Sequence, residues 1–279
     1  KTGFCGETGE IRAARAALHM WEEPCISGKE GSGTVFFTGC TLRCVFCQNH
    51  EIAGSKVGKV ISEERLAEIF LELQGKGANN INLVTPTHFV PQIIRALQSA
   101  KKQGMYLPVV YNTGGYERVE TLKMLDGLVD IYLPDFKYLN TDHAKKYSMA
   151  EDYPEVAKAA IAEMVRQAGK PVFDERGMMK RGVIVRHLLL PGCLADGKRV
   201  VKYLHETYGN RIYMSLMSQY TPLESLDTVK YPELNRKVPE YAYEKLVDYA
   251  ISLGVMQAFI QEGDTAKESF IPPFTLEGV

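Results

Sequence analysis

Three cysteines, Cys40, Cys44 and Cys47, lie within eight residues of the chain in a C-x3-C-x2-C pattern. Residues 33–39, just before them, are rich in β-branched and aromatic types and end in glycine, which predicts a strand that runs into a loop. Such a loop would hold three thiols close together, and thiolates are good ligands for zinc and for iron–sulfur clusters. The sequence therefore predicts a metal centre in this loop.

Several kinds of thiol chemistry can be compared at this loop. A structural zinc site usually takes its four ligands as two separated pairs; the chain has no second C-x2-C pair, so His50 would have to be the fourth ligand. A c-type haem needs His directly after C-x-x-C, but Gln48 stands there. A thioredoxin-like pair would leave Cys40 without a role, and three buried small hydrophobes are a further alternative. An iron–sulfur cluster with three protein ligands uses all three thiols and leaves one iron open to an outside ligand.

The residues around the three cysteines resemble a known family. The stretch 39–49, with an aromatic residue (Phe46) just before the last cysteine, resembles the radical S-adenosylmethionine (SAM) superfamily. It is similar to the activating-enzyme branch, whose best-known member activates pyruvate formate-lyase. The longer string 21–52 resembles a less studied group usually described as similar to that activating enzyme. The resemblance covers most of the chain.

This resemblance implies cofactors and a reaction. Cys40, Cys44 and Cys47 would hold one [4Fe–4S] cluster, whose open iron binds the amino and carboxylate groups of SAM. An electron from a flavodoxin- or ferredoxin-like donor would cleave SAM to methionine and a 5′-deoxyadenosyl radical. The radical would take a hydrogen atom from a substrate, which for an activating enzyme is a glycine of a partner glycyl-radical enzyme. A radical SAM reaction on another peptide, RNA or a small molecule stays open, as does a non-catalytic iron–sulfur or zinc protein.

Helix-like and strand-like segments alternate along the rest of the chain. Helical periodicity marks residues 62–73, 91–104, 119–125, 141–169 with a break at Pro154, 198–208 and 239–253. Apolar runs typical of buried strands lie at 80–85, 107–111, 128–133, 182–190, 211–217 and 255–260. This alternation predicts a parallel sheet with helices outside it, and residues 174–182 are expected to be a surface loop or hairpin. The resemblance makes this α/β fold a partial (β/α)6 TIM-like barrel of the radical SAM type.

We expect one barrel domain at 33–279 and an N-terminal extension at 1–32 that packs on it, with a helix-like run from Ile11 to Trp21. Parallel barrels place their chemistry at the carboxyl ends of their strands, and polar residues follow each expected strand. Arg186 lies inside an apolar strand, where an unpaired charge is costly, so we expect its side chain to face a polar barrel mouth.

The resemblance assigns SAM contacts to residues at these strand ends. They are Phe46, Thr85, Thr87, Asn112, Thr113, Asp135, Lys137, Arg186 and Leu188. The pair Asp135 and Lys137 matches the activating-enzyme pattern Asp-x-Lys. The turn 85–88 departs from the usual Gly-Gly-Glu turn, and Asn112 replaces an aspartate, which removes a charge from the expected site.

Composition and residue patterns argue against several classes of protein. Lys plus Arg number 33 against 34 Asp plus Glu in 279 residues, which argues against a generally basic nucleic-acid binder. No run reaches about 18 apolar residues and no signal-peptide pattern opens the chain, so no membrane span is expected. The remaining cysteines are not expected to form disulfides. A core of this size needs no disulfides, which favours reduced thiols and a cytoplasmic location. The start at Lys1 suggests that residues are missing upstream. If a cysteine-rich segment is among them, Cys5 is expected to be the last member of a small metal site; without it, Cys5 and Cys25 are expected to be unliganded, and Cys193 is expected to be a small core or loop residue.

Overall fold

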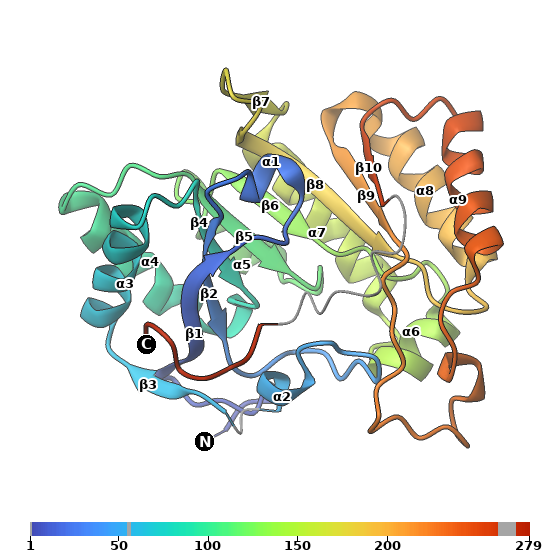
Figure 1. The fold of residues 1–279 in the computed structure, drawn as a ribbon, viewed down its shortest axis with the longest axis horizontal. Helices are drawn as coiled ribbons and strands as arrows, with labels where there is room; N and C mark the ends of the chain where they lie inside the picture. Colours follow the sequence, from blue (N-terminus) through green and yellow to red (C-terminus); the bar gives the residue numbers. More distant parts are fainter. Residues whose placement is uncertain (1, 55–56, 262–271) are drawn as a thin grey trace.

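A computed structural model describes residues 2–54, 57–261 and 272–279 (Figure 1). A run of parallel strands forms the centre of the fold. In spatial order they are β2 (Ser32–Phe37), β4 (Ile81–Val84), β5 (Val109–Thr113), β6 (Ile131–Pro134), β8 (Met179–Leu188), β9 (Tyr213–Met217) and β10 (Ala258–Ile260). The full strand order is β10-β9-β8-β6-β5-β4-β2-β1-β3, and among the described residues no pairing joins β10 to β3. The sheet is therefore an open, partial barrel.

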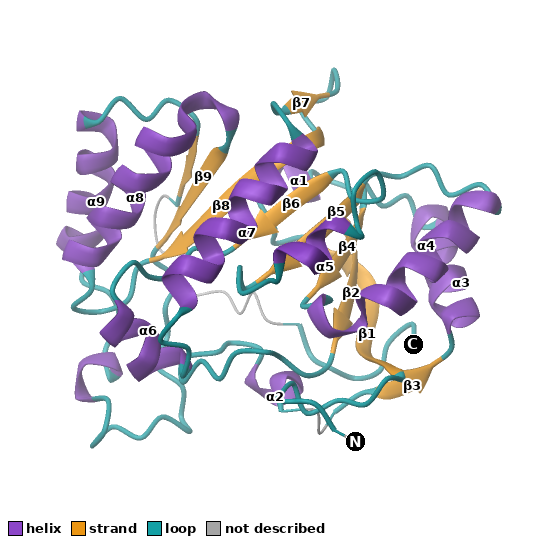
Figure 2. Ribbon diagram, turned by 180° about the vertical axis from the view of Figure 1, so that it is seen from behind, coloured by secondary structure: helices purple, strands orange, loops and turns teal. Residues whose placement is uncertain are grey.

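The helices lie on one side of this sheet (Figure 2). They are α3 (Glu63–Gly75), α4 (Val90–Lys102), α5 (Val119–Lys123), α7 (Tyr153–Ala168), α8 (Leu194–Tyr208) and α9 (Glu240–Ser252). Their positions confirm the predicted helices; Ser62, for example, caps α3 by accepting the N–H of Arg65 at 3.1 Å. Among the described residues, no helix is long and apolar enough to cross a bilayer.

The region 141–169 forms two helices as predicted, but the break is not at Pro154. Helix α6 (Thr141–Ser148) ends where Met149 takes a left-handed conformation at φ 56°, and Pro154 lies in the first turn of α7. A proline is tolerated there because the first N–H groups of a helix have no partner within the helix. The predicted hairpin is confirmed, since β7 (Val172–Phe173) pairs antiparallel with β8.

The helix-like run predicted from residue 11 is wrong, because Ile11–His19 forms strand β1. This strand pairs antiparallel with β2 on one edge and with β3 (Lys59–Ile61) on the other. Its alanines are buried on both faces, so the sequence lacks the polar–apolar alternation of a half-buried strand. Tertiary pairing thus overrides the high helix propensity of alanine.

The C-terminal segment continues the edge of β1 beyond β3. The N–H of Leu276 donates to the carbonyl of Ala14 at 3.2 Å, and the N–H of Ala16 donates to the carbonyl of Glu277 at 2.8 Å. A Cβ atom at Gly278 would clash with the carbonyl oxygen of Ala16, so this close approach requires glycine. The segment thereby covers backbone groups of β1 that an exposed edge would leave unpaired.

A short helix, α1 (Pro24–Ser27), lies inside the barrel (Figure 1). Its Ile26 is 0% exposed and belongs to an apolar cluster with Val110, Ile131, Leu133 and Ile184 from β5, β6 and β8. The side chains of Asn79 and Asn80 hold α1 there by donating to the carbonyls of Ser27 and Ile26, both at 2.7 Å. The helix divides the barrel interior into a compartment at the carboxyl ends of the strands and one at the amino ends.

We expect Ile26→Ala to destabilise the protein by about 2–5 kcal/mol, because it removes buried methylene groups and leaves a cavity inside the barrel. The matched control is Ile251→Ala on α9, where the side chain is 62% exposed and the change should stay within about 0.5 kcal/mol. Urea unfolding followed by circular dichroism measures both. Equal unfolding midpoints for the two variants would show that α1 does not support the barrel.

Candidate active site

The cysteine loop follows β2 and forms one wall of a cavity at the carboxyl ends of the strands. The predicted site residues that line this cavity are Cys40, Cys44, Phe46, Cys47, Thr85, Asn112, Thr113, Asp135, Lys137, Arg186 and Leu188. Of the predicted site residues, Thr87 does not line this cavity. The strand ends thus bring together residues spread over more than half of the chain, as a parallel barrel requires. Which of them contact SAM stays a prediction.

The cysteine loop is held in place by backbone hydrogen bonds. The N–H groups of Arg43 and Val45 donate to the carbonyls of Ser148 and Tyr147, at 3.3 and 2.9 Å. The N–H of Cys40 donates to the carbonyl of Cys5 at 3.3 Å. These bonds fix the loop between the end of α6 and the N-terminal residues.

The three thiols suit a cluster with positively charged irons. Removal from water raises the pKa of Cys40 to about 11 and that of Cys47 to about 12, and burial also raises the pKa of Cys44. Thiolates in such surroundings need a cation to stabilise them, which bound metal supplies. Among the described residues, no group of three or more His, Cys, Asp or Glu side chains is arranged to hold a single metal ion. A [4Fe–4S] cluster takes thiolates as its ligands, and all three cysteines of the loop line one cavity.

A network of charged groups lines the same cavity as the cysteines. Asp135 accepts from Lys137 Nζ at 2.6 Å and from Arg186 Nε at 2.9 Å. Arg186 also donates from Nη2 to Asn112 Oδ1 at 2.7 Å, which confirms that its side chain faces a polar barrel mouth. Burial works to raise the pKa of Asp135, but the charges of Arg186 and Lys137 outweigh it and the net shift is downward. The carboxylate therefore stays ionised and holds two cations at the cavity wall.

Glu22 completes this network, although it is not among the predicted site residues. Its Oε1 accepts from Asn82 at 3.0 Å and from Asn112 at 3.2 Å, and its Oε2 lies 3.4 Å from Arg186 Nη1. Burial raises the pKa of Glu22 and of the neighbouring Glu23. One sequence feature could have pointed to Glu22 and Glu23: both lie within residues 21–52, the string that resembles proteins similar to the activating enzyme.

Glu117 is a second buried carboxylate that the sequence analysis did not identify. It accepts hydrogen bonds from the hydroxyls of Thr87 at 2.5 Å, Thr113, and Tyr111 at 3.2 Å. Burial raises its pKa to about 7. Glu117 thereby ties the end of β4 to the end of β5, and Thr87 supports the cavity from outside its lining.

Thr85 connects the same two strand ends from within the cavity. Its backbone has φ 57°, a left-handed conformation that is uncommon for a β-branched residue, and its N–H donates to the carbonyl of Asn112 at 2.9 Å. Backbone outliers of this kind cluster at functional sites, which agrees with the position of Thr85 in the lining.

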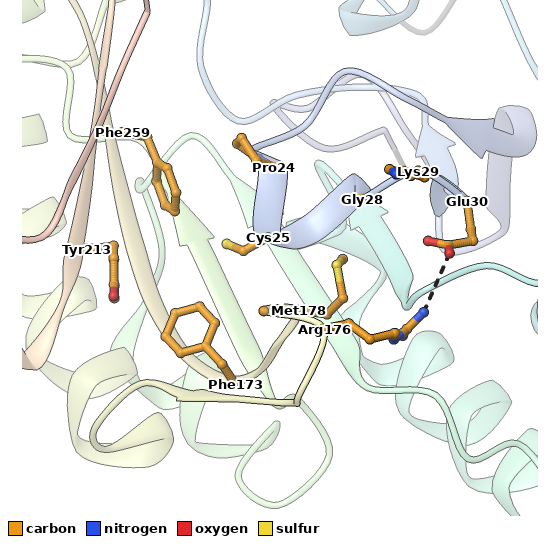
Figure 3. A pocket seen from close by; sticks show the side chains of 11 residues that line it. Pro24, Cys25, Gly28, Lys29, Glu30, Phe173, Arg176, Met178, Tyr213 and Phe259 are labelled. Atoms are coloured by element: carbon orange, nitrogen blue, oxygen red, sulfur yellow. Dashed lines mark ion pairs between the residues drawn. The ribbon is translucent and has the colours of Figure 1, made fainter.

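A second cavity, of about 530 Å³, lies on the other side of α1, at the amino ends of the strands (Figure 3). Its walls are mostly apolar and aromatic, Arg176 lies 3.6 Å from Glu30 at its edge, and burial raises the pKa of Cys25 to about 12. The three clustered thiols and the buried charge network around Asp135 favour the cavity at the cysteine loop as the active site.

We expect Glu117→Gln to flatten the dependence of stability on pH. Between its usual pKa of 4.5 and about 7, the folded protein keeps a proton on Glu117 that the unfolded chain has released, so this group makes stability fall as pH rises through that window. Urea unfolding of both proteins across the window measures the slope. The control, Glu155→Gln, changes a side chain that is 78% exposed and should keep the wild-type slope. A Glu117→Gln slope equal to the wild-type slope would contradict the raised pKa.

Several solved structures are similar to this chain. Streptococcus suis SuiB bound to S-adenosylmethionine matches with a TM-score of 0.54 and 12% identity, over 82% of this chain and 50% of that one. HydG, a maturase of the [FeFe]-hydrogenase, matches with a TM-score of 0.53 and 15% identity, over 83% of this chain and 50% of that one. The chain spans about half the length of these structures. At such identities the likeness shows the fold alone, and it confirms the predicted partial barrel.

Two curated relatives and one family model match the sequence. The uncharacterized protein MJ0674 of Methanocaldococcus jannaschii is 28% identical over 258 residues, 89% of this chain and 69% of that protein. The pyruvate formate-lyase-activating enzyme of Clostridium pasteurianum is 26% identical over 216 residues, 72% of this chain and 79% of that enzyme. Residues 34–192, more than half of the chain, match the model of the radical SAM superfamily. The chain therefore belongs to the radical SAM superfamily, whose enzymes use a [4Fe–4S] cluster and SAM as cofactors.

Proposed function

We propose that this radical SAM enzyme is an activating enzyme that abstracts a hydrogen atom from a glycine of a partner glycyl-radical enzyme. The observation that carries the proposal is the similarity to the pyruvate formate-lyase-activating enzyme, which extends over 79% of that enzyme. The similarity is thus not restricted to a short cysteine motif. The Asp135–Lys137 pair, which matches the activating-enzyme pattern, and Arg186 form one network in the cavity and support the same branch.

The cofactors, when bound, supply a one-electron cleavage of SAM that yields methionine and a 5′-deoxyadenosyl radical. The chain supplies the positions: Cys40, Cys44 and Cys47, which line the cavity, would hold the cluster. In the same lining, Asp135 fixes Lys137 and Arg186, whose remaining donors suit the carboxylate or ribose of SAM.

Apolar side chains of the cavity suit the adenine ring of SAM. Phe46 and Leu188 line the cavity, and the Nζ of Lys137 lies 5.8 Å from the centre of the Phe46 ring. This contact keeps an aromatic face beside the cation that Asp135 holds.

The reaction also needs an electron donor, and we propose a flavodoxin- or ferredoxin-like protein in a reducing cytoplasm, where free thiols and reduced clusters persist. Two cysteines outside the triad, Cys25 and Cys193, lie apart in the fold, on α1 and at the start of α8. Cys25 and Cys193 therefore do not form a second pair of thiols that could hold a further cluster.

We expect Cys44→Ala to lose cluster iron and the reductive cleavage of SAM. Wild-type protein reconstituted without oxygen should hold about four irons per chain and release 5′-deoxyadenosine when dithionite and SAM are added. The control, Cys193→Ala, removes a buried thiol at the start of α8 and should keep both properties. Retained cleavage in Cys44→Ala would contradict the ligand assignment. A wild-type cluster whose electron paramagnetic resonance spectrum does not change on adding SAM would indicate a non-catalytic iron–sulfur protein.

The activating role predicts a radical on a partner protein. Reduced, reconstituted enzyme with SAM should produce a glycyl-radical signal by electron paramagnetic resonance in the glycyl-radical enzyme encoded nearest to its gene. The matched control is the same partner with its acceptor glycine changed to alanine, which should give no signal. SAM cleavage without any glycyl radical would overturn the activating role and leave a peptide, RNA or small molecule as the substrate.

A further inference from the structure

Ser148, the last residue of α6, places a hydroxyl against the sulfur of a cluster ligand. Its Oγ lies 3.0 Å from Cys44 Sγ and 3.0 Å from the hydroxyl oxygen of Tyr138. Ser148 and Tyr138 are each 1% exposed. The three side chains form a continuous hydrogen-bonded chain that runs from the core to the thiol.

The direction of these hydrogen bonds follows from the chemistry of a bound cluster. A thiolate has no proton, so the hydroxyl of Ser148 can only donate to Cys44 Sγ. The Ser148 oxygen is then left to accept, and Tyr138 keeps its proton as the donor because burial raises its pKa. Each donation polarises the next, so Tyr138 strengthens the hydrogen bond that Ser148 makes to the sulfur.

The backbone keeps Ser148 at this position. Its carbonyl accepts the N–H of Arg43 at 3.3 Å, and the carbonyl of Tyr147 accepts the N–H of Val45 at 2.9 Å, so both neighbours of Cys44 in the loop are bound to the end of α6. The left-handed Met149 ends the helix directly after Ser148. These bonds hold the backbone of Ser148 beside the loop, and the contacts of its Oγ with Cys44 and Tyr138 orient the hydroxyl.

We propose that Ser148, supported by Tyr138, is a positioning residue that raises the reduction potential of the cluster by donating a hydrogen bond to the sulfur of Cys44. Reduction adds negative charge to the cluster and its thiolates, and a donor aimed at a ligand sulfur stabilises that charge. The inference rests on the cluster ligands of the proposed function and is independent of the substrate.

The test is a redox titration of the reconstituted protein, followed by electron paramagnetic resonance without SAM or substrate. Ser148→Ala should shift the midpoint potential to a more negative value at unchanged iron content, and Tyr138→Phe should shift it less in the same direction. Ser148→Thr keeps the hydroxyl and should restore the wild-type potential. The control, Ser99→Ala on α4, removes a serine hydroxyl that bonds within its own helix and should leave the potential unchanged.

Unchanged potentials in both Ser148→Ala and Tyr138→Phe would overturn the proposal. If Ser148→Ala loses iron, Tyr138→Phe still decides, because that variant keeps the Ser148 contacts to the loop. A shift in Tyr138→Phe supports the proposal and an unchanged potential refutes it. A wild-type protein with no reducible cluster would instead refute the cluster assignment itself.

Discussion

The salt bridges of Asp135 with Lys137 and Arg186 are the interaction on which the rest of the site depends. Three charged groups in a cavity wall cost several kcal/mol each in lost hydration unless they are paired. The pairing is possible because β6 and β8 are neighbours, which places the backbones of residues 135 and 186 side by side. Glu22 and Asn112 then occupy further donors of the guanidinium, and this fixes the plane of Arg186. The order of the parallel strands thus creates a polar barrel mouth in the cavity that the cysteines also line.

Much of the fold and part of the site could be predicted from sequence, for physical reasons. The βα units show periodicities that depend on neighbours in sequence, and polar residues after apolar runs mark the strand ends. Strand β1 could not be identified, because burial of both its faces hides the alternation. The role of Glu22 was also hidden, because its partner Arg186 is 164 positions away. Local sequence patterns do not indicate that the segment with Glu22 and α1 enters the barrel.

The segment around helix α1 explains both the position of Glu22 and the division of the barrel interior. The segment that follows β1 turns into the barrel, so Glu22 lines the cavity at the strand ends while Ile26 of α1 packs among aliphatic side chains. This segment therefore supplies part of the polar layer, and the helix that follows it closes the floor of the cavity. Two cavities of different chemistry result: the one at the cysteine loop holds three clustered thiols and the buried charges of Asp135, Lys137 and Arg186, whereas the other is mostly apolar, with Glu30 and Arg176 at its edge.

The pairing of residues 14–16 with residues 276–277 has a consequence for how the chain is made. During synthesis on the ribosome, β1 emerges early, but this part of its edge receives its partner only after the barrel strands have been translated. Until then, an alanine-rich strand has open backbone groups that could pair with another chain.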